Sequence, residues 1–209
     1  MTKHSIFLFL LSLAMASCHP QDNFSSDIQV GGPCQGCEAV HEYDKKELQA
    51  VDTLPGYGQH KPPMKVTGTI FQQDGKTPAS NVILYIYHTN RKGLYKAEKH
   101  AKEWGKVHGM YRGWIKTGPS GTYTFYSFRP APYPNGQEAE HIHMIVKEPG
   151  LQEYYIDNIV FTDDPLLSQR KKDKLSKRAG SGICTPIEEN GILMVQRDII
   201  LGLNIPDYP

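Results

Sequence analysis

The chain has 209 residues, which is enough for one domain with its own core and leaves room for an added tail. Its 23 Lys and Arg nearly balance its 22 Asp and Glu, so the formal net charge is +1. This balance excludes a general nucleic-acid-binding protein, which needs excess positive charge to neutralise phosphates. A hydrophobic content of 39% with 10% aromatic residues excludes a disordered chain.

Residues 1–18 have the pattern of an export signal. Lys3 and His4 precede the apolar run 6–16, which rises only about 16 Å as a helix and is too short for a bilayer of about 30 Å. Ala16-Ser17-Cys18 resembles a bacterial lipobox, in which an acylated Cys18 becomes the N-terminus and anchors the protein to a membrane of the cell envelope. The alternative is an ordinary signal peptide cleaved after Ala16, which also exports the protein.

Export places the remaining cysteines, Cys34, Cys37 and Cys184, in an oxidising compartment. Cys34 and Cys37 form a CxxC motif, but no thioredoxin-like βαβ pattern follows it and no second pair stands at zinc-ligand spacing. We therefore expect a structural disulfide, either between Cys34 and Cys37 or between one of them and Cys184.

The hydrophobic pattern predicts an all-β sandwich over residues 65–209, with long loops and one short helix. Residues 19–64 are polar, then rich in Gly, Pro and charge, and are interpreted as a tether and an irregular N-terminal arm. Residues 89–114 show no clean period and predict a long loop over the domain, of the kind that often carries function. The expected strands are 65–71, 81–88, 122–128, 140–147, 156–161 and 193–203, and the only helix-like stretch is 168–178.

The motif His141-Ile142-His143 lies in an expected strand. Residues i and i+2 of a strand point to the same face, so both imidazoles can reach one metal ion. The simpler alternative is a pair of histidines on a solvated strand face.

Two tyrosines can complete such a site. Tyr133 stands between Pro132 and Pro134, which restrict the backbone around it, and Tyr95 follows the expected strand 81–88. Phenolate is a hard anionic oxygen donor, so two Tyr and two His suit ferric iron better than zinc. Each tyrosine taken alone is more simply interpreted as a packing aromatic.

Five segments in order resemble the intradiol ring-cleavage dioxygenases, the family of the catechol and protocatechuate enzymes. The segment 88–95 resembles the one that supplies their first tyrosine ligand, and 118–128 resembles the strand that follows it. The segment 129–134 resembles the loop of their second tyrosine, and His141-Ile142-His143 resembles their paired histidines. The last segment, 161–166, resembles their Phe-x-x-Asp-Pro, and the resemblance covers about residues 65–203.

The resemblance implies a β-sandwich with one non-haem Fe(III) as cofactor. Tyr95 and His141 are then the equatorial ligands, and Tyr133 and His143 the axial ones. The partners it implies are a small-molecule catechol, which is cleaved between its two hydroxyl carbons, and O2. Tyr133 leaves the metal on substrate binding and acts as a base for a substrate proton.

Two positions depart from the family pattern. An Arg usually stands three residues before the first ligand histidine, where this chain has Glu138, and a pocket Gln is replaced by Asn158. A cation at that position stabilises anionic species near the metal, whereas a carboxylate opposes them. Arg129 or Arg112 is expected to supply the missing charge.

The departure keeps other functions open. One is an exported, transthyretin-like binding module or inactive homologue that retains the metal site, and another is a purely structural envelope lipoprotein. The sequence leaves the preferred catechol and the oligomeric state open.

Overall fold

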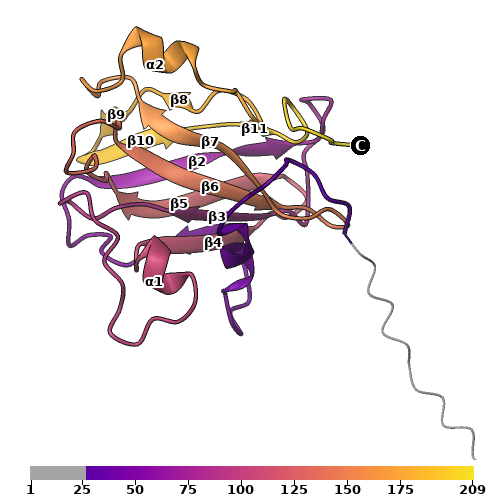
Figure 1. Ribbon diagram of the computed structural model, residues 1–209, viewed down its shortest axis with the longest axis horizontal. Helices are drawn as coiled ribbons and strands as arrows, with labels where there is room; N and C mark the ends of the chain where they lie inside the picture. The colour runs from indigo at the N-terminus through magenta and orange to yellow at the C-terminus, as the bar shows by residue number, and fades with distance from the viewer. Residues whose placement is uncertain (1–26) are drawn as a thin grey trace, which may run out of the picture.

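The computed structural model describes residues 27–209, which form a sandwich of two β-sheets (Figure 1). The predicted all-β sandwich is therefore confirmed. In order across the first sheet lie β1 (Val51–Thr53), β5 (Thr122–Phe128), β2 (Pro63–Phe71), β10 (Ile192–Gln196) and β9 (Ile187–Glu189), and β11 (Ile199–Ile200) also pairs with β2. Across the second sheet lie β4 (Arg112–Lys116), β3 (Ile83–Tyr87), β6 (His141–Lys147), β7 (Tyr154–Phe161) and β8 (Ile183–Cys184). Three short helices complete the description: η1 (Cys37–His41), α1 (Gly105–His108) and α2 (Gln169–Asp173).

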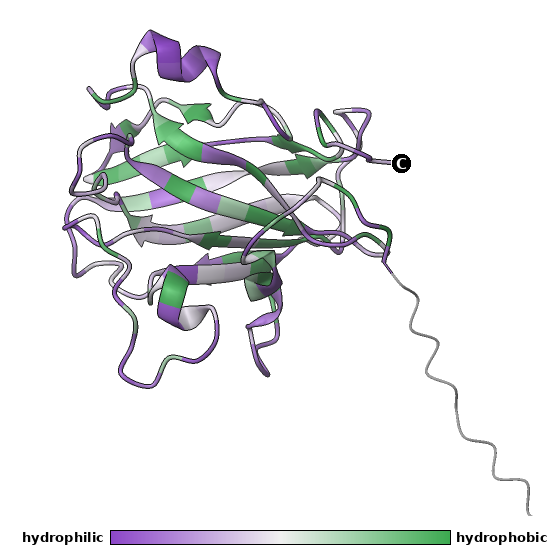
Figure 2. Ribbon diagram, viewed as in Figure 1, coloured by the Kyte–Doolittle hydropathy of each residue, from purple (hydrophilic) through white to green (hydrophobic). Residues whose placement is uncertain are grey.

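The core lies between the sheets because strand residues alternate in direction. In β6, Ile142, Met144 and Val146 belong to the main hydrophobic cluster, whereas His141 and His143 are only partly buried. Figure 2 shows most hydrophobic residues on the strands and an almost wholly hydrophilic α2. The inward side chains of β6 thus build the core, and its two histidines are left for the outer face.

Part of the expected long loop 89–114 is regular structure, which corrects that prediction. It contains α1, and the strand β4 begins at Arg112 and pairs antiparallel with β3. Gly113 made this strand difficult to recognise, since glycine weakens a strand pattern. A Cβ at Gly113 would lie 2.4 Å from Leu54, so glycine allows the other sheet to approach closely.

The expected last strand 193–203 is two strands, β10 and β11, which both pair parallel with β2. The interruption lies opposite Gly68, where a Cβ would collide with the carbonyl oxygen of Arg197. Asp198 accepts a hydrogen bond there from the backbone N–H of Thr69, at 2.9 Å. A contact with β2, rather than a turn sequence, therefore divides the strand.

The N-terminal segment packs more closely than expected of an irregular arm. It contains η1 and β1, and Val30, Ala39, Val40 and Leu54 are buried. The strand β2 begins at Pro63 rather than at residue 65. Residues from 27 onward thus belong to the packed body of the protein.

Of the two expected disulfide arrangements, the structure has Cys34–Cys37, and Cys184 is a buried free thiol. The expected signal and Cys18 lie outside the described residues. Within 27–209, no helix combines the length and the hydrophobicity needed to cross a membrane.

Candidate metal centre

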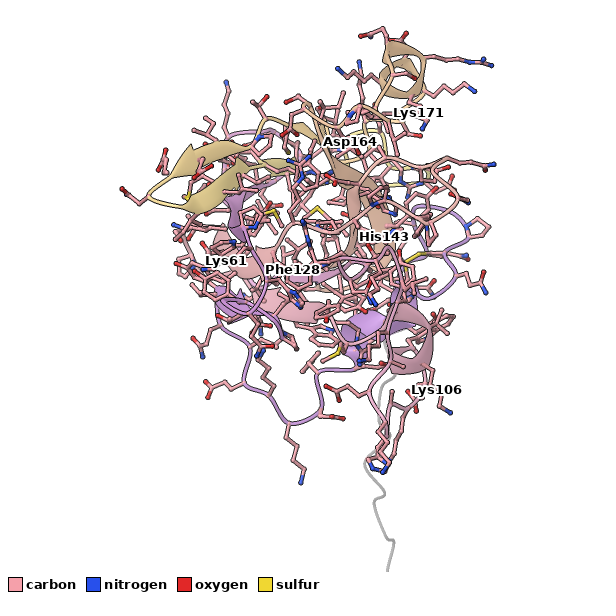
Figure 3. All side chains as sticks on the ribbon, turned by 90° about the vertical axis from the view of Figure 1, so that its left-hand side faces the viewer. Lys61, Lys106, Phe128, His143, Asp164 and Lys171 are labelled. Carbon is pink, nitrogen blue, oxygen red and sulfur yellow. A yellow bond between two sulfur atoms is a disulfide. The ribbon has the colours of Figure 1, made fainter. Side chains whose placement is uncertain are left out.

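His141 and His143 lie on the outer face of β6, and His143 is labelled in Figure 3. Their Nε2 atoms are 3.1 Å apart. The Nδ1 of His141 donates to the carbonyl oxygen of Ala139 at 2.7 Å, because a carbonyl can only accept. This bond leaves the lone pair of Nε2 free, which is the usual orientation of a metal-binding histidine.

Both tyrosines meet these nitrogens. The hydroxyl of Tyr95 lies 2.7 Å from that of Tyr133 and 2.8 Å from Nε2 of His143. The Tyr133 hydroxyl lies 3.2 Å from Nε2 of His141 and 3.5 Å from Nε2 of His143. All four predicted ligands are therefore gathered at one point.

Contacts between two loops bring the tyrosines together. The hydroxyl of Thr89 donates to the carbonyl oxygen of Ala131 at 2.7 Å, and Asn90 accepts from the Ala131 N–H at 3.3 Å. A Cβ at Gly93 would lie 2.0 Å from the carbonyl oxygen of Pro132, and Gly93 has a left-handed φ of +73°. Glycine is thus required where the Tyr95 loop crosses the Tyr133 loop.

The donor atoms fit one metal ion. Two ligands bound at about 2.0–2.2 Å and about 90–110° apart lie about 3.0–3.5 Å from each other, close to the spacing of these four atoms. In the described part of the chain, no group of three or more His, Cys, Asp or Glu residues is placed to hold a metal. The tyrosines are therefore needed to complete the donor set, and two phenolates favour a hard ferric ion.

Burial sets the protonation of these groups before any metal binds. It lowers the pKa of His141 and lowers that of His143 further below its usual value, so both imidazoles are neutral at neutral pH. Burial and the contact with Tyr133 raise the pKa of Tyr95, which keeps its phenol protonated. A bound cation reverses this preference for the phenol, so metal binding must release a proton from Tyr95.

A cavity of about 680 Å³ opens beside the donor atoms, and Tyr133, His141 and His143 lie in its wall. The apolar part of its lining consists of Ala139, Ile156, Val160, Leu167 and Leu175. Lys171 and Lys174, which no sequence motif singled out, also line it. Figure 3 shows Lys171 on α2 above His143. The only sequence feature that could have indicated these lysines is the basic run 170–174.

Two predicted residues, Glu138 and Asn158, line this cavity. Glu138 is exposed and so stands at the rim, whereas Asn158 is half-buried beside His143.

The expectation that Arg129 or Arg112 supplies the missing cation is not supported. Neither residue lines the cavity. Arg129 is paired with Glu140 at 2.5 Å and with Asp163 at 2.7 Å, and Arg112 is paired with Glu42 at 2.6 Å. Both positive charges are thus already compensated by carboxylates.

The chain matches the family model described as Dioxygenase over residues 31–174. A comparison with curated proteins finds no match. Solved structures share the fold: the dioxygenase domain of a dioxygenase–carbohydrate-binding protein fusion from Streptomyces sp. SirexAA-E has a TM-score of 0.57 at 21% identity, with 76% of this chain and 92% of that chain covered. For chlorocatechol 1,2-dioxygenase from Pseudomonas putida the TM-score is 0.52 at 17% identity, with 75% and 67% covered. For hydroxyquinol 1,2-dioxygenase from Pseudomonas putida DLL-E4 it is 0.52 at 15% identity, with 87% and 68% covered. The chain belongs to the dioxygenase family of the intradiol ring-cleavage enzymes.

Proposed function

We propose that this protein is a non-haem Fe(III) intradiol dioxygenase. It cleaves a catechol-type diol between its two hydroxyl carbons, adds both atoms of O2 and forms a muconate-type dicarboxylate. The observation that carries the proposal is the convergence of two phenol oxygens and two imidazole nitrogens at spacings of 2.7–3.5 Å. That donor set is suited to ferric iron and unsuited to a structural zinc site.

Tyr95, Tyr133, His141 and His143 would hold the metal. Ferric iron there would supply Lewis-acid activation of a catecholate and would orient it. Tyr95 does not line the cavity, whereas Tyr133 does, so a substrate entering the cavity meets Tyr133 first.

This position gives Tyr133 a role in proton transfer. Its oxygen lies at the cavity wall and contacts both imidazoles and the Tyr95 hydroxyl. As a phenolate, it accepts a proton from an incoming substrate hydroxyl, which is general base catalysis by a positioned side chain.

The rest of the cavity positions the ring. Ile156, Val160 and Leu167 present apolar surface to an aromatic substrate, so the diol is the only part of a simple catechol that requires polar contacts. The apolar contacts with the ring hold the substrate so that its two hydroxyl groups face the donor atoms.

A second candidate is a binding protein that keeps the metal and the catechol but has little turnover. The observation in its favour is that no arginine lines the cavity among the described residues, while the carboxylate of Glu138 does. The cations in the lining are Lys171, whose Nζ donates to the Gln137 carbonyl, and the exposed Lys174. A preorganised cation beside the reacting centre is normally a large part of electrostatic catalysis.

Oxygen uptake separates the two candidates. The mature protein is loaded with ferric iron, its visible spectrum is recorded with and without catechol under argon, and O2 is then admitted. A dioxygenase consumes about one O2 per catechol and forms a muconate-type product. A spectral change without O2 uptake supports the binding protein, and a colourless protein that binds no iron contradicts both candidates.

A further inference from the structure

Three aromatic rings form a column beside the metal centre. The ring of His143 lies flat against Tyr87, with centroids 4.4 Å apart and planes 13° apart. Tyr87 also lies flat against His108, with centroids 3.8 Å apart and planes 6° apart. Two rings so close and parallel to a third cannot share one of its faces. His143, Tyr87 and His108 therefore form one ring column, with Tyr87 in the middle.

The sheet places the inner pair of this ring column. Tyr87 of β3 and His143 of β6 are direct partners in the antiparallel register, so their side chains lie side by side on the outer face. Tyr85, two residues earlier on the same strand, has its hydroxyl 2.9 Å from Nδ1 of His108. This contact holds the His108 ring beside the strand that also carries Tyr87.

The disulfide loop borders the outer end of the ring column, where Trp104 stacks on His108 with centroids 5.3 Å apart and planes 29° apart. A Cβ at Gly36 would lie 2.8 Å from Nε2 of His108 and 3.2 Å from the Trp104 ring, and Gly36 has a φ of +85°. Glycine is therefore required here both for space and for its left-handed backbone. Gly36 lies between Cys34 and Cys37, which are joined by the disulfide.

One side of this loop is firmly attached. Cys37, Ala39 and Val40 of η1 are buried with Tyr85 and Trp114. The other side, residues 33–35, borders a smaller cavity of about 240 Å³ together with Tyr87 and His143. The disulfide links the bordering side to the attached side, so it limits movement of the loop away from the rings.

We propose that the Cys34–Cys37 loop presses on the ring column and thereby fixes the orientation of His143, with Tyr87 as the positioning residue that transmits the contact. This inference rests on the proposed function, in which His143 is a metal ligand. The reason it matters is that the terminal torsion of a histidine is broad, so an unsupported ring turns its lone pair away from the metal. His141 has a hydrogen bond to a backbone carbonyl for this purpose, whereas His143 has the Asn158 side chain beside it and the flat contact with Tyr87.

The experiment measures ferric iron affinity by competition with a chelator, together with the visible spectrum. Tyr87→Leu removes the ring and is expected to weaken iron binding about 10- to 100-fold and to broaden the visible band. Tyr87→Phe keeps the flat contact and should bind iron within about threefold of wild type. The matched control is Tyr126→Leu, since Tyr126 is also a half-buried strand tyrosine but lies in β5 of the other sheet, where it packs on Tyr57.

The disulfide is tested by the double variant Cys34→Ser/Cys37→Ser, because a reductant would also reduce the iron. Its affinity is expected to fall about tenfold, while circular dichroism of the metal-free protein stays that of a folded sandwich. Wild-type affinity and spectrum in the double variant would overturn the role of the disulfide loop, and the same result in Tyr87→Leu would overturn the whole inference. If Tyr87→Leu does not fold, the double variant decides alone. A wild-type protein that binds no iron contradicts the proposed function instead.

Discussion

His88 makes the fold sensitive to acid. It follows β3 directly, is fully buried and begins the loop that leads to Tyr95. Its Nδ1 donates to the carbonyl oxygen of Thr89 at 2.8 Å, and the Ser127 hydroxyl donates to its Nε2 at 2.7 Å. The ring is therefore neutral, and burial lowers its pKa to about 4.

The magnitude follows from the difference between the folded pKa of about 4 and the unfolded value of about 6.5. Because the unfolded chain binds the proton more tightly, stability is fully present above about pH 6.5 and is lost as the pH falls toward 4. At pH 5 the proton-binding polynomial of His88 in the unfolded chain is about 30 times that in the folded chain, which lowers the free energy of unfolding by about 2 kcal/mol.

The assay is urea denaturation of the metal-free protein at about pH 7.5 and about pH 5. Wild type should lose about 2 kcal/mol more than His88→Gln, which cannot titrate. His100→Gln is the matched control, since His100 is exposed and should leave the pH dependence of wild type unchanged.

Ser127→Ala provides an independent check on the same histidine. Without the donated hydrogen bond the neutral ring is less favoured, so the loss between the two pH values should become smaller. Equal pH dependence in wild type and His88→Gln would refute the reasoning.

Three further predictions concern the site and the export signal. Tyr95→Phe and Tyr133→Phe should each shift or bleach the visible band of the iron-loaded protein while the fold persists by circular dichroism; an unchanged spectrum in both contradicts the phenolate ligands. Glu138→Arg should raise the ratio of kcat/KM for protocatechuate to kcat/KM for catechol by about three- to tenfold, because water at the exposed rim weakens the effect of the charge. An unchanged ratio in an active enzyme places Glu138 outside substrate recognition. Cys18→Ser should release the protein from the membrane fraction, because acylation supplies the anchor, and unchanged membrane association counts against the lipobox.

Local patterns in the sequence were sufficient for the class of fold and for the types of residue at the site. Alternation predicted β6 with both histidines on one face, because a strand has a period of two wherever it lies. The two prolines around Tyr133 and the order of five segments indicated a tyrosine-containing site. Even so, the sequence left two disulfide arrangements open, and only the folded chain selected Cys34–Cys37.

Contacts between residues distant in the chain were decided by the tertiary structure alone. The strand β4 was missed because Gly113 has a packing role that is visible only once Leu54 lies against it. Arg129 was expected near the substrate, but Glu140 and Asp163 compensate its charge, and a charge by itself does not reveal its partner. Tyr87 and His108 carry no metal-ligand signal, and their role follows from a register that places Tyr87 beside His143. The sequence determines which face each side chain takes within a strand, whereas the neighbour across that face depends on pairing and loop closure over long distances along the chain.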